Sequence, residues 1–342
     1  MLGLLLPIDW HSAGGNPKQV KAFASVASMQ SNMIANATAL ASRTPRTAAW
    51  GWRTLACRRS VSASTNATDL VLFSLDEKSK VATLTLNSPS TYNALTVEMG
   101  EAFEDIITNR LVPGLESGQI NANSLVLCGA GDKAFSAGGD LKWLKSLRHN
   151  PTHINVDNMM SFYRSFLCIR NLQIPTIAAI HGPAIGAGAC LALGADLRVA
   201  SPNSKLGFSF ATLGIHAGMG GSHFLPLSVG RSLANEALLT GKIFTGEEAM
   251  EVGLVNTLAQ TDDSVAVKEK AMELAKKVAK QHPLAVRTMT KSIRLKEDEG
   301  LDAALQREAY AQALCYARGD WGEGIDANVE RRDPVFEDYL SK

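Results

Sequence analysis

The chain has 342 residues, 46% of them hydrophobic, and a net charge of +1, which is ordinary for a globular protein with a sizeable core. No apolar run reaches the roughly 18 residues that span a bilayer, so we do not expect an integral membrane protein. The five cysteines have neither CxxC nor another metal-ligand spacing, which argues against a metal site and a disulfide framework.

The basic residues are concentrated at the N-terminus. Residues 1–67 carry seven basic residues and one acid, a net +6 against +1 for the whole chain, so the remainder has −5. That remainder shows no basic footprint for nucleic acid. Residues 11–68 contain no acid and are rich in Ala, Ser, Thr and Asn, a composition typical of organellar transit peptides. We therefore predict a targeting leader over residues 1–66, addressed to the mitochondrial matrix or, as the alternative, to a plastid.

After the leader, the apolar pattern switches between strand and helix periods. Residues 70–75 and 81–86 alternate about a charged turn and predict a hairpin. Residues 96–111 have helical spacing. Further strands are predicted at 124–129, 175–180, 197–200 and 205–208, and further helices at 141–147, 158–171 and 187–193. From residue 218 the pattern is almost wholly helical, including 263–280, 284–293, 301–317 and 322–332. The fold class is thus α/β with a C-terminal helical region.

Two short runs of small residues each follow a predicted strand and lead into a helix. Residues 135–141 read FSAGGDL, and residues 181–190 read HGPAIGAGAC. Two such turns can bring two backbone N–H groups to one ligand oxygen and form an oxyanion hole, and glycine or alanine leaves room for that approach. Taken singly, each run is also compatible with a plain tight turn.

Together with other motifs, these runs make the chain resemble the crotonase superfamily of enoyl-CoA hydratases and isomerases. The resemblance extends from about Leu70 to Phe336 and includes LNSPSTYNAL at residues 86–95 and GIHAGMGG at residues 214–221. It implies a spiral of ββα units over residues 67–260 and a C-terminal helical region, 261–342, that supports trimers or hexamers. It also implies an acyl-CoA substrate, with no cofactor beyond the coenzyme A that the substrate carries.

The resemblance assigns the two oxyanion donors to the N–H groups of Gly139 and Ala187. The other positions that it places along the acyl-CoA path are Tyr92, Ala94, Ala137, Gly138, Asp140, Leu141, Gly186 and Phe210. Asp140 is equally well suited to cap the following helix.

The acid and base groups depart from the family pattern. Hydratases of the family use two glutamates, and the matching positions here hold Cys190 and Phe210. The hydrolase branch of the family carries an acid at one further position. In this chain that position holds Gly218, so this acid is absent too. Cys190 is a candidate nucleophile or a small buried apolar residue. His216 is a candidate general base or a structural imidazole. Phe210 more simply closes the acyl pocket with apolar surface.

The reaction therefore stays open among three classes. The first is a hydratase or isomerase of fatty-acid or branched-chain acyl-CoA breakdown with substitute proton-transfer groups. The second is hydrolysis or decarboxylation on the same oxyanion hole. The third is a non-catalytic acyl-CoA-binding subunit. No nucleotide-binding GxGxxG run after a strand and no clustered metal-ligand set is present in the sequence.

Overall fold

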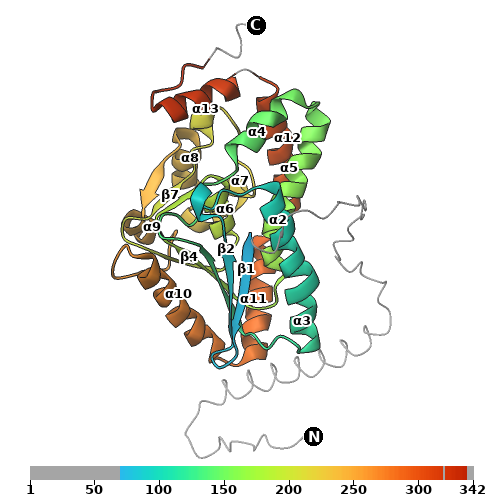
Figure 1. Cartoon of the computed structure of the whole chain (residues 1–342), viewed down its shortest axis with the longest axis vertical. Helices are drawn as coiled ribbons and strands as arrows, with labels where there is room; N and C mark the ends of the chain where they lie inside the picture. The colour runs from blue at the N-terminus through green and yellow to red at the C-terminus, as the bar shows by residue number, and fades with distance from the viewer. Residues whose placement is uncertain (1–69, 319, 337–342) are drawn as a thin grey trace, which may run out of the picture. The chain divides into compact units, whose positions relative to one another are not determined.

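The computed structural model describes residues 70–318 and 320–336 (Figure 1). The predicted leader, residues 1–66, lies outside the described residues. Within the described part, no helix combines the length and the apolar character that crossing a membrane requires.

A six-stranded sheet forms the centre of the fold. β1 (Val71–Asp76) and β2 (Val81–Leu86) make the predicted antiparallel hairpin. β3 (Ser124–Gly129), β4 (Thr176–Ile180), β6 (Leu197–Ala200) and β9 (Thr257–Leu258) then follow in parallel, in the order β1-β2-β3-β4-β6-β9. The central strands β3 and β4 are buried along their whole length, as parallel strands covered on both faces are.

A second, three-stranded sheet has the order β5-β7-β8. Its strands are β5 (Pro183–Ile185), β7 (Lys205–Gly207) and β8 (Ile243–Thr245). The prediction of an almost wholly helical chain after residue 218 was wrong at β8 and β9, and β5 was not predicted. These strands have only two or three residues, too few to show an alternating pattern, and they form because β7 and β6 offer them pairing partners.

The helices agree with the predicted ones in order and differ mainly at their ends. Thr96 caps α2, accepting a hydrogen bond from the Met99 N–H at 3.1 Å, and a π-helical segment over Asp105–Leu111 continues that helix into α3. The predicted helix at 158–171 starts earlier, at Thr152. The helices are α2 (Val97–Glu104), α3 (Val112–Ser117), α4 (Leu141–Ser146), α5 (Thr152–Leu167), α6 (Ala187–Leu193), α7 (Gly221–Val229), α8 (Arg231–Thr240), α9 (Gly246–Glu251), α10 (Ser264–Ala279), α11 (Pro283–Glu297), α12 (Leu301–Tyr316) and α13 (Asp320–Glu330).

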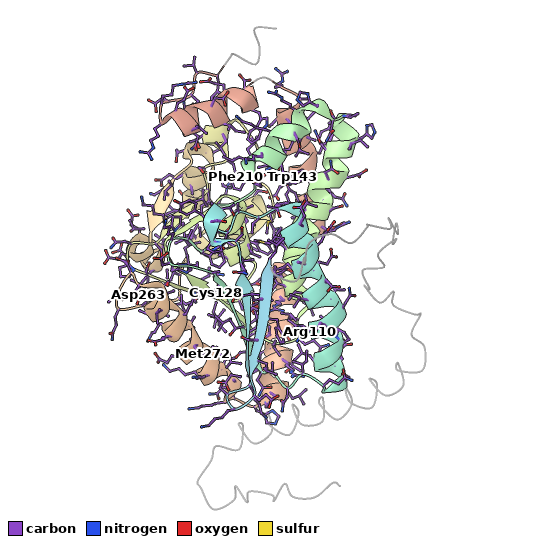
Figure 2. The ribbon with its side chains drawn as sticks, viewed as in Figure 1. Arg110, Cys128, Trp143, Phe210, Asp263 and Met272 are labelled. Carbon is purple, nitrogen blue, oxygen red and sulfur yellow. The ribbon has the colours of Figure 1, made fainter. Side chains whose placement is uncertain are left out.

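The six-stranded sheet has apolar packing on both of its faces. On one face, Val267 and Ala271 of α10 join Val126 and Cys128 of β3 in a small core, against which Met272 packs. Figure 2 labels Cys128 and Met272. The other face contributes to the main core with α2 and α5. Helix α12 packs along α5 and also contacts α7 and α13.

Candidate active site

The first small-residue turn is held by hydrogen bonds from both of its sides. The Leu95 N–H donates to the Gly138 carbonyl at 2.7 Å, and the Asp140 N–H donates to the Leu95 carbonyl at 3.0 Å. The Ser136 hydroxyl donates to the Asn93 carbonyl at 2.8 Å and accepts from the Gly138 N–H at 3.2 Å. The N–H groups of the two residues that flank Gly139, Gly138 and Asp140, are therefore hydrogen-bonded, and no acceptor faces the Gly139 N–H among the described residues.

The second turn lies directly against the first. The Ile185 N–H donates to the Ser136 carbonyl at 3.1 Å. A Cβ at Gly138, where φ is +95°, would lie 2.5 Å from the Ile185 carbonyl oxygen and 3.6 Å from the Ala187 nitrogen. Only glycine fits this position, because both its backbone conformation and its space exclude a side chain.

Helix α6 begins in this second turn, at Ala187. A Cβ at Gly188 would lie 2.7 Å from the Ser136 carbonyl oxygen, so the helix start is packed tightly against the first turn. The first N–H groups of a helix have no partner within the helix. Among the described residues, neither the Ala187 N–H nor the Gly139 N–H has a hydrogen-bond acceptor.

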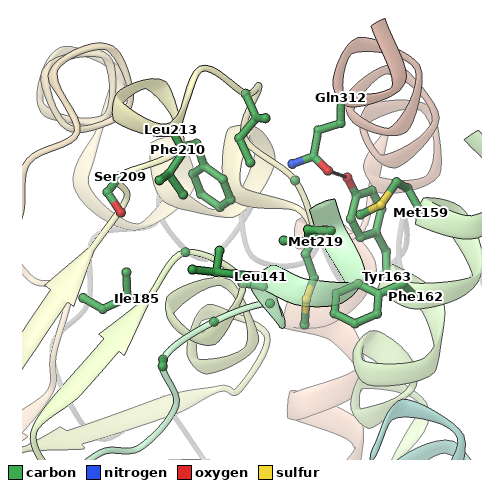
Figure 3. A pocket seen from close by; sticks show the side chains of 18 of the residues that line it. Leu141, Met159, Phe162, Tyr163, Ile185, Ser209, Phe210, Leu213, Met219 and Gln312 are labelled. Atoms are coloured by element: carbon green, nitrogen blue, oxygen red, sulfur yellow. Dashed lines mark hydrogen bonds between the residues drawn. The ribbon is translucent and has the colours of Figure 1, made fainter. Parts of the chain in front are cut away.

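Both of these N–H groups belong to residues that line one cavity of about 70 Å³ (Figure 3). Its wall is mostly apolar. The apolar side chains in it come from Leu141, Leu144, Met159, Phe162, Ile185, Phe210, Leu213, Ile215 and Met219. The cavity therefore combines two unpaired backbone donors with an apolar surround, an arrangement suited to a carbonyl that carries a hydrocarbon chain.

The family-model comparison identifies the kind of protein that has this site. A model described as enoyl-CoA hydratase/isomerase matches residues 76–339, which is most of the chain. The chain belongs to the enoyl-CoA hydratase/isomerase family.

Individual relatives agree with this assignment. A putative enoyl-CoA hydratase of Thermus thermophilus is 34% identical over 264 residues, covering 76% of this chain and 98% of that protein. A probable mitochondrial enoyl-CoA hydratase 2 of Arabidopsis thaliana is 32% identical, covering 75% of this chain and 82% of that protein. A solved enoyl-CoA hydratase/isomerase of Pseudoalteromonas atlantica is 28% identical with a TM-score of 0.66, covering 78% of this chain and 100% of that one. The predicted crotonase-type α/β fold is thus confirmed.

Seven of the residues that the sequence placed at the site line the cavity. They are Ala137, Gly138, Gly139, Leu141, Gly186, Ala187 and Phe210. The Phe210 ring covers the second turn, because a Cβ at Gly186 would lie 3.8 Å from it. Phe210 thus presents an aromatic face to the cavity at the position where hydratases of the family carry a glutamate.

Tyr92, Ala94 and Asp140 lie outside the residues that line the cavity. Tyr92 is 49% exposed, with the Lys133 Nζ 5.8 Å from its ring centroid. The Asp140 side chain accepts a hydrogen bond from the Trp143 N–H at 2.7 Å and so caps α4. The role of these three residues along the coenzyme A path therefore stays a prediction.

Cys190 is buried behind the cavity wall and is not one of the lining residues. Its Sγ would lie 3.0 Å from a Cβ at Gly221, so the thiol faces the start of α7. Burial first, and then the nearby Glu308 carboxylate, raise the pKa of this thiol well above its ordinary value. A nucleophilic cysteine needs the thiolate. The environment of Cys190 therefore favours a packing role.

His216 also lies outside the cavity lining. Its Nδ1 lies 2.6 Å from the Ala217 carbonyl oxygen. Because a carbonyl only accepts, Nδ1 carries the proton. The imidazole is thus held by the backbone of the neighbouring residue, which favours a structural role over that of a general base in the cavity.

The sequence reasoning missed a polar group in the cavity wall, made of Tyr163, Gln312 and Tyr316. The Tyr163 hydroxyl donates to the Gln312 Oε1 at 2.8 Å, and the Tyr316 hydroxyl donates to the same oxygen at 3.0 Å. Two members of this group, Gln312 and Tyr316, could have been found from the sequence, because they share one face of a helix with a third polar residue, Glu308. They recur every four residues along the predicted helix at 301–317, and all three are buried.

Glu308 stabilises the turn that leads into α7. It accepts hydrogen bonds from the Gly220 N–H and the Ser222 N–H, both at 2.8 Å, and from the Ser222 hydroxyl at 2.6 Å. Burial raises the pKa of this carboxyl, and these hydrogen bonds act in the opposite direction. A carboxylate at a helix start satisfies N–H groups that have no partner within the helix. Glu308 therefore holds the turn at Gly220 and Ser222 in place, and with it the neighbouring residues Gly218 and Met219, which line the cavity.

Proposed function

We propose that the chain is an acyl-CoA-processing enzyme of the enoyl-CoA hydratase/isomerase family that holds the thioester carbonyl between the N–H groups of Gly139 and Ala187. The observation that carries this proposal is the pair of unpaired amides at one apolar cavity. Such donors act on the negative charge that develops on the carbonyl oxygen when the thioester becomes an enolate or a tetrahedral intermediate. The substrate itself carries the coenzyme A, so the proposal requires no separate cofactor.

The apolar wall supports a hydrocarbon acyl group, and the small volume, about 70 Å³, favours a short one. We place the reaction in fatty-acid or branched-chain acyl-CoA breakdown. Hydration or isomerisation would need proton-transfer groups other than the two glutamates, because Cys190 and Phe210 stand at those positions.

A second candidate is supported by the chemistry of the cavity wall. Among the described residues that line it, none is an aspartate or a glutamate. Thioester hydrolysis or decarboxylation on the same oxyanion hole, or acyl-CoA binding without turnover, would not need the usual pair of carboxylates. Turnover of crotonyl-CoA separates the first proposal from these alternatives.

We also propose a mitochondrial matrix location, with a plastid as the alternative. The basic, acid-free composition of residues 11–68 supports it, as does the mitochondrial designation in the name of the Arabidopsis relative. Mass spectrometry of the protein from isolated organelles tests it. A mature N-terminus between about residues 59 and 68 supports the leader, and a full-length chain contradicts it.

For the assembly we propose a homotrimer or homohexamer built through the region 261–342. Helix α11 exposes four large apolar side chains that a second subunit would cover: Leu284, Met289, Ile293 and Leu295. Sedimentation equilibrium of the purified protein tests this, and a monomer mass at micromolar concentration would contradict it.

The experiment that tests the proposed function is crotonyl-CoA hydration by the purified protein, followed by the absorbance of the conjugated thioester. Loss of absorbance at an enzymatic rate without release of the coenzyme A thiol supports a hydratase that uses substitute groups, and loss with release of that thiol supports hydrolysis. Unchanged absorbance together with measurable acyl-CoA binding favours the second candidate. Failure to bind any acyl-CoA would overturn the proposal.

A further inference from the structure

A group of three hydrogen-bonded side chains interrupts the apolar wall of the cavity. Tyr163 comes from α5, and Gln312 and Tyr316 come from α12. Figure 3 shows the Gln312 amide meeting the Tyr163 hydroxyl above the labelled Met159 and Phe162. Tyr163 and Tyr316 are each 1% exposed and Gln312 is 3% exposed, so the protein has buried this polar group completely.

The direction of each proton in this group is fixed by its partners. The Gln312 Nε2 lies 2.7 Å from the His216 carbonyl oxygen, which only accepts, so the amide nitrogen must face it. The Gln312 Oε1 then faces the two hydroxyls and accepts from both. Burial raises the pKa of Tyr163 and of Tyr316, so both phenols keep their protons. The Tyr163 hydroxyl therefore donates to Gln312 and has lone pairs left to accept with. The Tyr316 hydroxyl has a second acceptor within reach, the Met159 Sδ at 3.7 Å.

The Tyr163 hydroxyl occupies space that a side chain at position 218 would take. A Cβ at Gly218 would overlap the Tyr163 hydroxyl and would lie 2.7 Å from the Gln312 Nε2. Gly218 itself lines the cavity. Gly218 is also the position at which the hydrolase branch of the family carries an acid. The phenol thus stands beside the cavity at the place where the carboxylate is missing.

We propose that Tyr163, oriented by Gln312, is a hydroxyl-binding subsite that accepts a hydrogen bond from a hydroxyl group on the acyl chain of the bound thioester. The inference deepens the proposed function and rests on it. A purely hydrocarbon chain packed against Tyr163 leaves a buried acceptor unpaired, which weakens binding. A chain with a hydroxyl at the matching carbon satisfies that acceptor, and a site built in this way discriminates against the analogue that lacks the group. In this account Tyr163 contacts the substrate hydroxyl directly, and Gln312, which acts through Tyr163, is a positioning residue.

The test compares four thioesters that differ only in the acyl chain: butyryl-CoA and its 2-, 3- and 4-hydroxy derivatives. Their dissociation constants are measured by calorimetry for the full-length protein and for Tyr163→Phe, which removes only the phenol oxygen. We expect one hydroxy isomer to bind the wild-type protein at least about tenfold tighter than butyryl-CoA. We expect the Tyr163→Phe variant to lose that preference while its affinity for butyryl-CoA stays equal or rises.

The control is Tyr310→Phe, which removes a phenol oxygen from a tyrosine that is 56% exposed on the same helix as Gln312. It should keep the wild-type preference. If Tyr163→Phe fails to fold, Tyr163→Met serves in its place, because it also removes the phenol oxygen, leaves an apolar side chain and should remove the preference as well. Equal binding of all four thioesters to the wild-type protein, or a preference that survives in Tyr163→Phe, overturns the inference alone. Binding of none of them overturns the proposed function together with it.

Discussion

Three residues decide which chemistry the cavity can perform. Cys190, Phe210 and Gly218 stand where members of the family carry acids, and none of them transfers a proton as a carboxylate does. The two backbone donors remain, because they depend on the path of the chain and on the absence of side chains. At this scale the proposed site is an oxyanion hole without the usual acid and base, and its two proposed donors can be tested one atom at a time.

Replacing Gly139 with proline removes one proposed donor and nothing else from the hydrogen-bond pattern, because its N–H has no acceptor among the described residues. We expect turnover of the substrate to fall by about 10²–10³. Gly139→Ala is the matched control. It keeps the N–H and adds a Cβ that would lie 3.1 Å from the end of the Leu144 side chain, so its turnover should stay within about tenfold of wild type. Equal turnover in both variants would contradict the assignment of Gly139.

Cys190 should be chemically inert. Iodoacetamide labelling followed by peptide mass spectrometry should modify the half-buried Cys315 faster than the fully buried Cys190. Cys190→Ala should keep acyl-CoA binding and lose about 1 kcal/mol of unfolding free energy, since it removes one buried sulfur. Preferential labelling of Cys190, with loss of activity in Cys190→Ala, would restore it as the nucleophile.

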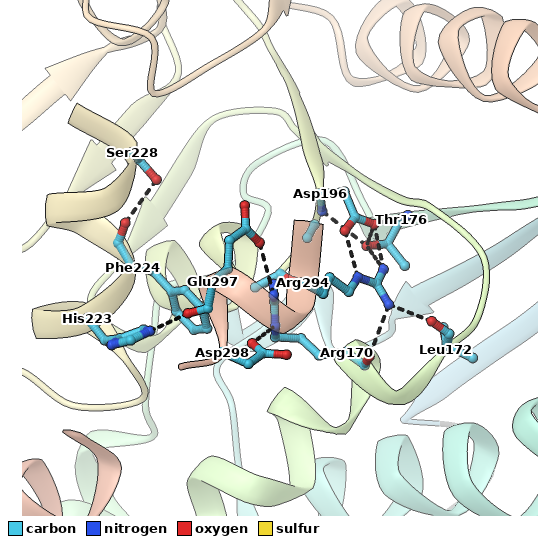
Figure 4. Close-up of polar contacts among 12 residues, drawn as sticks. Arg170, Leu172, Thr176, Asp196, His223, Phe224, Ser228, Arg294, Glu297 and Asp298 are labelled. Carbon is cyan, nitrogen blue, oxygen red and sulfur yellow. Dashed lines mark hydrogen bonds and ion pairs between the residues drawn. The ribbon is translucent and has the colours of Figure 1, made fainter. Parts of the chain in front are cut away.

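Among the elements, α11 is joined to the sheet by charged side chains (Figure 4). Arg294 of α11 is 5% exposed and donates to the two carboxylate oxygens of Asp196, at 2.7 and 2.5 Å. Asp196 also accepts from the Thr176 N–H at 2.6 Å, at the start of β4. Burial acts to raise the pKa of Asp196, but the hydrogen bond and charge of Arg294 hold it below its ordinary value. Nearby, Arg170 pairs with Asp298 at 2.6 Å and ties the end of α11 to the same region.

Breaking this pair should cost far more than breaking an exposed one. Asp196→Asn leaves the buried Arg294 guanidinium without its counter-charge, and we expect a loss of about 3–5 kcal/mol in unfolding free energy. The control is Asp302→Asn, whose ion pair with Arg164 is 43% exposed on both sides and should cost less than about 1 kcal/mol. Urea denaturation of both variants measures the difference, and similar losses would contradict the role given to Asp196.

The sequence predicts the long elements and both turns, because these carry their own local signal. Thr96 caps a helix with the expected apolar spacing, and the two glycine-rich runs lie where they were predicted. Strands β8 and β9 escaped prediction because they have two or three residues and depend on partners far along the chain. The Tyr163–Gln312 contact joins residues far apart in sequence, so no local pattern reveals it.

Across the whole molecule, family membership fixes the architecture and leaves the reaction open. The family match covers residues 76–339, and the sheet with its covering helices brings the two small-residue turns to one cavity. The reaction depends on a few side chains that the fold tolerates in several forms. The unfolding free energy depends on buried groups outside the cavity, and His181 is the one that should make it depend on pH.

His181 is fully buried, and neither of its ring nitrogens has a hydrogen-bond partner in the described structure. Burial first, and then the charge of Lys268, lower its pKa from 6.5 to about 4. The unfolded chain therefore binds a proton between pH 6.5 and about pH 4 that the folded chain does not. The stabilising contribution is complete above pH 6.5 and is lost as the pH falls through this range, by at most about 1.4 kcal/mol per pH unit.

His181→Gln should flatten this dependence, because glutamine does not titrate. Urea midpoints of the wild-type protein and the variant, measured between pH 7 and pH 4.5, give the comparison. His153→Gln, at an exposed position, should keep the wild-type profile. A profile that is equally steep in His181→Gln would show that other groups cause the loss.

The central claim is that the N–H groups of Gly139 and Ala187 hold the thioester carbonyl. Difference infrared spectroscopy of butyryl-CoA labelled with ¹³C at that carbonyl tests it most directly, because hydrogen bonds to the oxygen lower the stretching frequency. We predict a lower frequency in the wild-type complex than for the free thioester in water. The shift should persist in Gly139→Ala and be largely lost in Gly139→Pro. The same frequency in the wild-type and Gly139→Pro complexes would contradict the account.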